Sequence, residues 1–240
     1  MKARVIVLLL VLATSACNKR AAVQPAAAQG TAVGVALVEV GGSKQIARVG
    51  AILDQPIVVQ VNDAQGSALQ GASVIVSGPP GVKFDPVTGL TDSSGQFTTV
   101  VSASGTPGHF QIVADTGGGK APELKMDEIA LGYQQELGRD LNVRYCARCH
   151  DPESTPERVS NMDNLDPKPH AFTEGDVLNK IGDSDLVAII NHGGPALSKS
   201  ASMPPFGFTL TKTEIEALIS YIRAVSDPPY RAVGAAYANK

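Results

Sequence analysis

The feature that most constrains this chain is the segment Cys146-Ala147-Arg148-Cys149-His150, a C-x-x-C-H pattern. Two thiols at this spacing lie together on one helical turn, where they can add across the two vinyl groups of a porphyrin. The next side chain, His150, then lies beneath the iron as its proximal ligand. The pattern therefore predicts one covalently attached haem c on Cys146 and Cys149.

Two other chemistries use paired cysteines at this spacing. A zinc site needs four ligands, and only His150 and distant histidines are available to complete one. A redox dithiol of the thioredoxin type needs a βαβ setting, which the surrounding pattern does not provide. The chain has three cysteines in all, and the third, Cys17, belongs to a different segment, so no pair is left for a disulfide.

Residues 1–17 have the pattern of an export signal. Lys2 and Arg4 precede a short apolar run at 5–13, which is too short to span a bilayer, and Thr14-Ser15-Ala16-Cys17 follows it. The segment resembles a bacterial lipoprotein signal, in which the cysteine is acylated, although Thr14 stands where Leu is usual. The resemblance implies a lipid anchor on Cys17, and the alternative is ordinary secretion with an unused Cys17.

If Cys17 is acylated, the protein is exported and held on the periplasmic or cell-surface side of a bacterial membrane. Asn18 follows the cysteine in place of the Asp associated with inner-membrane retention, which favours the outer membrane. Residues 18–30 are rich in Ala and lack a core pattern, so we expect a tether there.

Residues 31–116 predict a β domain. Short β-branched runs at 56–61, 72–76, 96–101 and 109–113 are separated by turn residues, as in an antiparallel sandwich. An Asp-Ala-x-Gly turn at 63–66 and a Thr-Asp-x-x-Gly turn at 91–95 resemble the bacterial immunoglobulin-like domains of invasin-type surface proteins. We expect a spacer or docking module there, with residues 117–122 as a glycine-rich linker behind it.

The sixth iron ligand has four candidates, Met162, His170, His192 and Met203. Met203 precedes two prolines, which fix an extended backbone able to hold a thioether over the haem. Met162 lies in a polar loop, and either histidine would give a bis-histidine haem. His192 lies before Gly193 at a predicted helix end, where a histidine complements the helix dipole without being a ligand. Met203 is the predicted ligand.

Residues 123–240 are predicted to fold as a helical haem domain. We expect helices at 127–141 and 183–191, and a capping box formed by Thr211 and Glu214 before an amphipathic final helix. That helix has apolar side chains at helical spacing and a Tyr221-Ile222 pair. The apolar positions are Ile215, Leu218, Ile219 and Ile222.

The motif, the Met-Pro segment and the aromatic-Ile pair resemble class I cytochromes c over nearly all of 127–226. The resemblance implies an all-α domain with one haem, axial His150 and Met203, and first and last helices that cross closely. Either Gly138 or Gly132 would then lie against Tyr221. The predicted fold is therefore an all-β immunoglobulin-like sandwich followed by an all-α class I cytochrome c domain.

Charge limits the partners. Residues 17–120 have no net charge, whereas residues 121–240 carry twelve basic and seventeen acidic side chains. The sequence has no basic patch, which argues against nucleic acid as a partner. We therefore expect a membrane-anchored electron carrier, not an enzyme, whose redox partner has a basic docking face. The alternative is a surface adhesion protein whose haem domain is a redox sensor.

Overall fold

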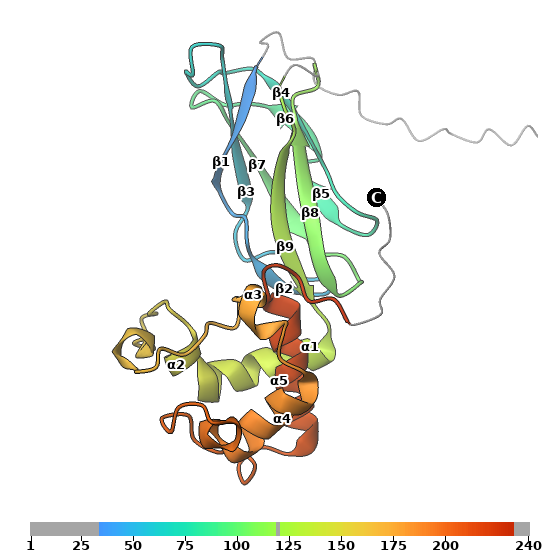
Figure 1. The fold of residues 1–240 in the computed structure, drawn as a ribbon. Coiled ribbons are helices and arrows are strands. Elements are labelled where there is room, and N and C mark those ends of the chain that lie inside the picture. Colours follow the sequence, from blue (N-terminus) through green and yellow to red (C-terminus); the bar gives the residue numbers. More distant parts are fainter. Residues whose placement is uncertain (1–33, 119–120, 233–240) are drawn as a thin grey trace, which may run out of the picture.

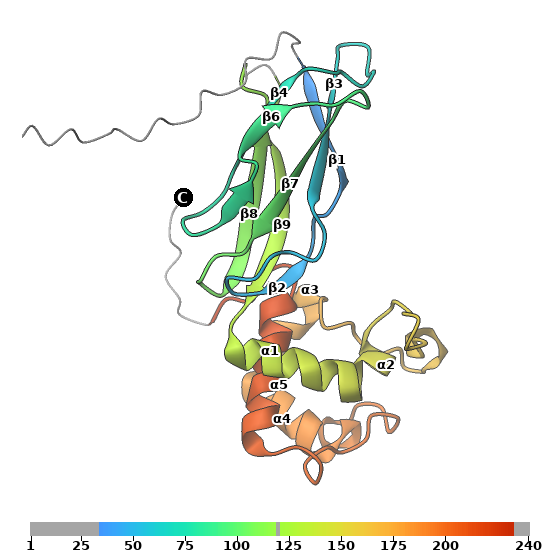
Figure 2. The same ribbon diagram turned by 180° about the vertical axis from the view of Figure 1, so that it is seen from behind.

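The computed structural model describes residues 34–118 and 121–232, and the predicted signal, Cys17 and the tether lie outside these ranges. A β-sandwich stands on a helical domain, and the helices gather below one end of the sandwich (Figures 1 and 2). None of the described helices is long and apolar enough to cross a membrane.

The sandwich has two sheets. The first has the order β1-β3-β7-β5 and is antiparallel. Its strands are β1 (Ala36–Gly41), β3 (Ile57–Asn62), β7 (Gln96–Ser102) and β5 (Lys83–Asp85). The second has the order β2-β9-β8-β4-β6, in which only β2 pairs parallel to its neighbour. Its strands are β2 (Ile46–Arg48), β9 (Leu124–Leu131), β8 (Gly108–Asp115), β4 (Ser73–Ser77) and β6 (Thr88–Leu90).

Alternating side chains of both sheets form one core. Val59 and Phe97 come from the first sheet, and Val74, Ile112 and Met126 come from the second; all are buried in one cluster. Buried and more exposed positions alternate along β3, β7 and β8, which is the two-residue period of a strand with one face in the core. The predicted immunoglobulin-like sandwich is confirmed, with four predicted strands within two residues of β3, β4, β7 and β8.

The predicted end of the sandwich at residue 116 is wrong. Strand β9 pairs antiparallel with β8 from Gly108↔Ala130 to Ala114↔Leu124. The segment 117–122 therefore connects two neighbouring strands and does not separate two domains. The sandwich extends to Leu131, and the predicted helix at 127–141 begins only at Tyr133.

Glu128 explains this error. It occupies an inward position of β9 and is fully buried between Met126 and Ala130. A charged residue at an inward position interrupts the apolar alternation of a strand, so the sequence gives no strand signal there, and the helix expected at 127–141 followed from the resemblance to class I cytochromes c.

The second half of the chain is helical. It begins with α1 (Tyr133–Leu141), which continues through a π-helical turn, η1 (Asn142–Cys146), into α2 (Ala147–His150). After them come η2 (Met162–Asn164), α3 (Gly175–Leu178), α4 (Asp183–His192), η3 (Gly194–Leu197) and α5 (Lys212–Val225).

Helix α5 begins as predicted. The Thr211 hydroxyl accepts a hydrogen bond from Glu214 N at 3.3 Å, and Glu214 Oε2 accepts one from Thr211 N at 2.7 Å, which is a capping box. The four predicted apolar positions of α5 are buried. Helices α1 and α5 cross at Gly138, where an added Cβ would lie 2.1 Å from the Ala217 carbonyl oxygen and 2.7 Å from Tyr221 Cβ. Gly138, and not Gly132, is therefore the close contact with Tyr221.

The two domains share a small apolar cluster. Leu131 at the end of β9 packs with Tyr221, Ala224 and Val225 of α5. Beside it, Arg48 of β2 lies 3.3 Å from the Glu136 carboxylate on α1. Arg139 donates a hydrogen bond to the Ile46 carbonyl at 3.3 Å. The sandwich therefore contacts the helical domain through both side chains and backbone.

Candidate haem site

The two cysteines of the motif lie where the π-helical segment meets the next helix: Cys146 ends η1, and Cys149 lies in α2. Cys146 is buried in the main apolar cluster of the helical domain, whereas Cys149, one turn later, is half-buried and forms no disulfide with it. Burial, and secondarily the neighbouring Cys149, raises the pKa of the Cys146 thiol to about 12. A raised pKa disfavours the thiolate, which is the form in which a catalytic cysteine reacts.

His150 is held by its Nδ1 atom. Nδ1 lies 2.7 Å from the His170 carbonyl oxygen. Because a carbonyl only accepts, Nδ1 carries the proton and donates, and Nε2 keeps its lone pair. Burial lowers the pKa of His150, although the hydrogen bond to His170 opposes this effect. The neutral ring with a free Nε2 is the form that binds a metal, and the carbonyl fixes its orientation.

Met203 lies in the same part of the domain as Cys146. Its side chain packs against the apolar cluster that contains Cys146 and Ile190. Its carbonyl accepts a hydrogen bond from Gly194 N at 3.1 Å. An added Cβ on Gly193 would lie 2.8 Å from that same oxygen. The end of α4 therefore supports the Met203 segment through close backbone contact that only glycine allows.

The three competing candidates lie in other surroundings. Met162 is buried in η2 but outside the cluster of Cys146 and Met203. His192 is exposed in the last turn of α4. The His170 side chain bonds Glu174 Oε2 at 2.8 Å, and the residue contacts His150 through its carbonyl oxygen and not through its ring.

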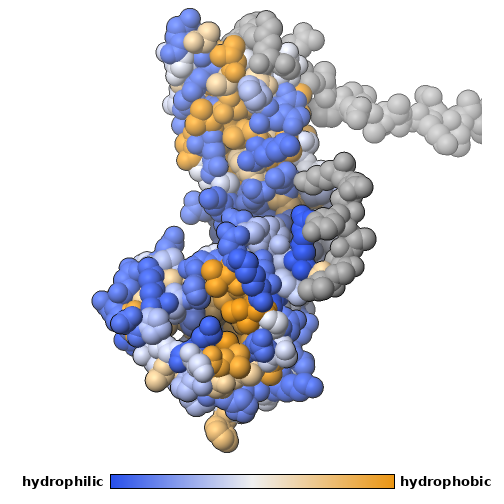
Figure 3. Space-filling model, viewed as in Figure 1, coloured by the Kyte–Doolittle hydropathy of each residue, from blue (hydrophilic) through white to orange (hydrophobic). Residues whose placement is uncertain are grey.

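Hydrophobic side chains gather on the face of the helical domain between α2 and α4, where the surface is hollowed (Figure 3). The cluster of this domain includes Cys146, Met203 and the partly buried rings of Tyr145, Phe172 and Phe206. A flat apolar group attached to the cysteines would thus have apolar side chains to pack against. The two thiols, the His150 Nε2 and the Met203 thioether together fit haem c.

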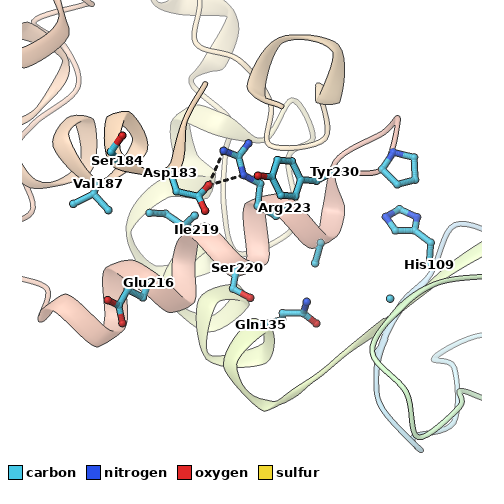
Figure 4. A pocket seen from close by; sticks show the side chains of 13 residues that line it. His109, Gln135, Asp183, Ser184, Val187, Glu216, Ile219, Ser220, Arg223 and Tyr230 are labelled. Atoms are coloured by element: carbon cyan, nitrogen blue, oxygen red, sulfur yellow. Dashed lines mark hydrogen bonds and ion pairs between the residues drawn. The ribbon is translucent and has the colours of Figure 1, made fainter. Parts of the chain in front are cut away.

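A second hollow lies apart from these residues. A groove of about 730 Å³ runs between α1, α4, α5 and the start of β8 (Figure 4). In it, Arg223 donates to Asp183 Oδ1 through Nε at 3.0 Å and through Nη2 at 2.7 Å, and its guanidinium lies 4.2 Å from the Tyr230 ring. Arg223 Nη1 also donates to the Leu178 carbonyl at 2.6 Å. The groove holds a structural clamp and none of the four predicted haem residues.

Comparison with known proteins defines the class of the helical domain. Residues 134–222 match the family model described as cytochrome c oxidase, cbb3-type, subunit III. That match covers less than half of the chain. The chain therefore joins an immunoglobulin-like sandwich to a cytochrome c domain, and cytochrome c domains carry covalently bound haem c.

Solved structures resemble the sandwich part. Invasin, a bacterial integrin-binding protein, is 19% identical, and the match covers 40% of this chain and 19% of that chain with a TM-score of 0.33. The D00-D0 domain of intimin is 18% identical over 44% and 50% of the two chains, with a TM-score of 0.33. The adhesin InvE of Yersinia pseudotuberculosis is 13% identical over 39% and 30%, with a TM-score of 0.32.

The chain thus spans half or less of the length of each of these structures. No curated protein matches the sequence significantly.

Proposed function

We propose that this protein is a membrane-anchored electron carrier in which Cys146 and Cys149 hold one haem c and His150 and Met203 are its axial ligands. One observation carries the proposal: the His150 Nδ1 contact with the His170 carbonyl leaves Nε2 as a ligand beside the two thiols. The cytochrome c match over 134–222 includes all four residues and supports the same assignment.

Each side chain has a defined part in this proposal. The two thiols attach the haem covalently, so that the protein retains the haem without relying on non-covalent binding. His150 supplies a neutral nitrogen of fixed orientation, and the Met203 thioether favours ferrous iron and so raises the reduction potential. With both axial positions filled, the iron has no open position for a substrate, which favours transfer of single electrons over catalysis.

The anchor is proposed on Cys17, which lies outside the described residues. Its acylation would hold the protein on a bacterial membrane, with the outer membrane favoured by Asn18. Mass spectrometry of the mature protein checks this point. A mature chain without acyl groups on Cys17 would contradict it.

The redox partner is proposed to have a basic docking face, because residues 121–240 have five more acidic than basic side chains. Attraction between opposite charges weakens as salt is added. The rate of electron exchange should therefore fall as ionic strength rises, and a rate independent of salt would argue against a basic partner.

The axial pair is tested by Met203→Ala, with Met162→Ala as the matched control. The purified protein should keep its haem through denaturation and acid extraction. The ferric form should show the weak sulfur-to-iron band at the red edge of the visible spectrum. Met203→Ala should abolish this band and lower the potential, because the thioether's preference for ferrous iron is lost.

Met162→Ala should keep both the band and the potential. A native protein that lacks the band, and in which His170→Ala or His192→Ala opens the iron to carbon monoxide, would make the haem bis-histidine. Haem extracted quantitatively from the unmodified protein would contradict covalent attachment altogether.

A further inference from the structure

Phe172 lies against the predicted proximal ligand. Its ring stacks on the His150 imidazole, with 4.8 Å between the ring centroids and 25° between the ring planes. Phe172 follows His170 by two positions in the sequence, and the His170 carbonyl accepts the hydrogen bond from His150 Nδ1. One short segment, 170–172, therefore contacts His150 both through a backbone oxygen and through an aromatic face.

The same Phe172 side chain packs against the cluster that joins the two domains. That cluster contains Leu131 from β9 together with Tyr221 and Val225 from α5, and Ile46 of β2 packs against it as well. Leu131 is fully buried. Side chains of the sandwich are therefore part of the packed group on which Phe172 rests.

Hydrogen bonds on both sides of Phe172 limit its movement. Glu174 Oε1 accepts from Ala171 N at 2.9 Å. Asp227 N donates to the Thr173 carbonyl at 2.9 Å, and Gly175 N donates to the Asp227 carbonyl at 3.0 Å. The segment thus keeps its place against the chain that follows α5. Because packed interiors transmit small displacements, a change at Leu131 or Ile46 should reach the Phe172 ring.

We propose that the sandwich is a working part of the haem centre and that Phe172 is the positioning residue through which it fixes the proximal imidazole. The inference rests on the proposed ligation by His150. It gives the immunoglobulin-like domain a function beyond that of a spacer: packing at the domain interface sets the orientation of the imidazole, and with it the reduction potential.

The experiment uses the full-length haem-loaded protein and changes the sandwich side only. Ile46→Ala removes packing next to the interface cluster, and Leu69→Ala is the matched control. Both side chains are partly buried and lose three carbons, neither change alters charge, and Leu69 packs on the core of the sandwich instead of the interface. The readouts are the reduction potential and the hyperfine-shifted haem methyl resonances, which report the orientation of the axial imidazole.

Ile46→Ala should shift both the potential and the methyl pattern, and Leu69→Ala should shift neither, even where it lowers the melting temperature. Phe172→Leu should shift the potential and the methyl resonances in the same direction as Ile46→Ala. Phe172→Tyr keeps an aromatic ring and should keep the native potential and resonances. Equal readouts for Ile46→Ala and Leu69→Ala would overturn the coupling, even if Phe172→Leu had an effect. Failure of the proposed function would show separately, as an unmodified protein without covalent haem or histidine ligation.

Discussion

At the scale of single residues, His150 is held by two contacts: its Nδ1 atom lies 2.7 Å from the His170 carbonyl oxygen, and its ring stacks on Phe172. The C-x-x-C-H pattern was enough to select Cys146, Cys149 and His150, and the comparison with known proteins confirms a haem c domain around them. The contact of His150 with the His170 carbonyl was not predictable. A sequence shows which side chains are present, whereas the direction of a carbonyl depends on dihedral angles that the fold sets.

Glu128 is a second residue whose role depends on burial. Its carboxylate lies in the sandwich, where Oε2 accepts from Gln45 N at 2.7 Å and Oε1 has no partner among the described residues. Burial is the largest cause that raises its pKa, to about 7, with the charges of Glu39 and Asp127 adding to the effect. The group therefore favours its protonated form in the folded state.

The sign of the resulting pH dependence follows from proton uptake. Between about pH 4.5 and 7 the folded chain keeps a proton on Glu128 that the unfolded chain releases, so the free energy of unfolding falls as pH rises through this window. A pKa difference of this size corresponds to about 3 kcal/mol. Glu128→Gln should remove this fall in the free energy of unfolding. The variant should therefore become more stable than the native protein as pH rises from about 4.5, and the difference should become constant above about pH 7.

Denaturant unfolding at several pH values measures this difference. Glu123→Gln is the control, because Glu123 is exposed just before the same strand. For Glu123→Gln, the plot of the free energy of unfolding against pH should run parallel to that of the native protein. A Glu128→Gln profile that is also parallel would mean that the carboxyl is not buried in the folded state.

At the scale of elements, short-range patterns predicted α4, α5 and the central strands, and they failed where a long-range pairing decides the structure. The capping box of α5 is local, and so is its apolar stripe. Strand β9 exists because β8 pairs with it from Leu124 to Ala130, and a short segment containing Asp127 and Glu128 does not reveal that partner. Strand β1 and the brief strands β2, β5 and β6 were not predicted either, because their pairing partners also lie far away in the sequence.

The α1–α5 crossing gives a prediction at this scale. Gly138→Ala places a methyl group against the Ala217 carbonyl and Tyr221, which forces the helices apart. Overpacking of this kind typically costs about 1–3 kcal/mol. Thermal unfolding of the haem-loaded protein should show the loss. Gly105→Ala, where an added Cβ meets nothing within 4 Å, should be neutral or slightly stabilising, and equal effects of the two changes would refute a close crossing.

At the scale of the whole molecule, the glycine-rich stretch at 117–122 was the most misleading signal. Its composition is that of a linker, but a hairpin connection has the same composition, because both need residues that break regular structure. The true passage between the domains is short: β9 ends at Leu131, and α1 begins at Tyr133. Gly132 between them caps α1, with the Gln135 side-chain oxygen accepting from its N–H at 2.9 Å.

The two possible boundaries make opposite predictions for truncated proteins. A haem-loaded chain that begins at residue 117 keeps β9 without β8 and exposes an unpaired strand with buried-type side chains such as Met126, so it should self-associate in size-exclusion chromatography. A chain that begins at residue 132 lacks that strand and should be monomeric. It should melt below the full-length protein, because it exposes the cluster around Tyr221 and Val225, and burial of such side chains is worth about 1.5–3 kcal/mol each. If the chain from 117 is instead monomeric and melts like the full-length protein, the sandwich ends at residue 116 and the domain interface adds no stability.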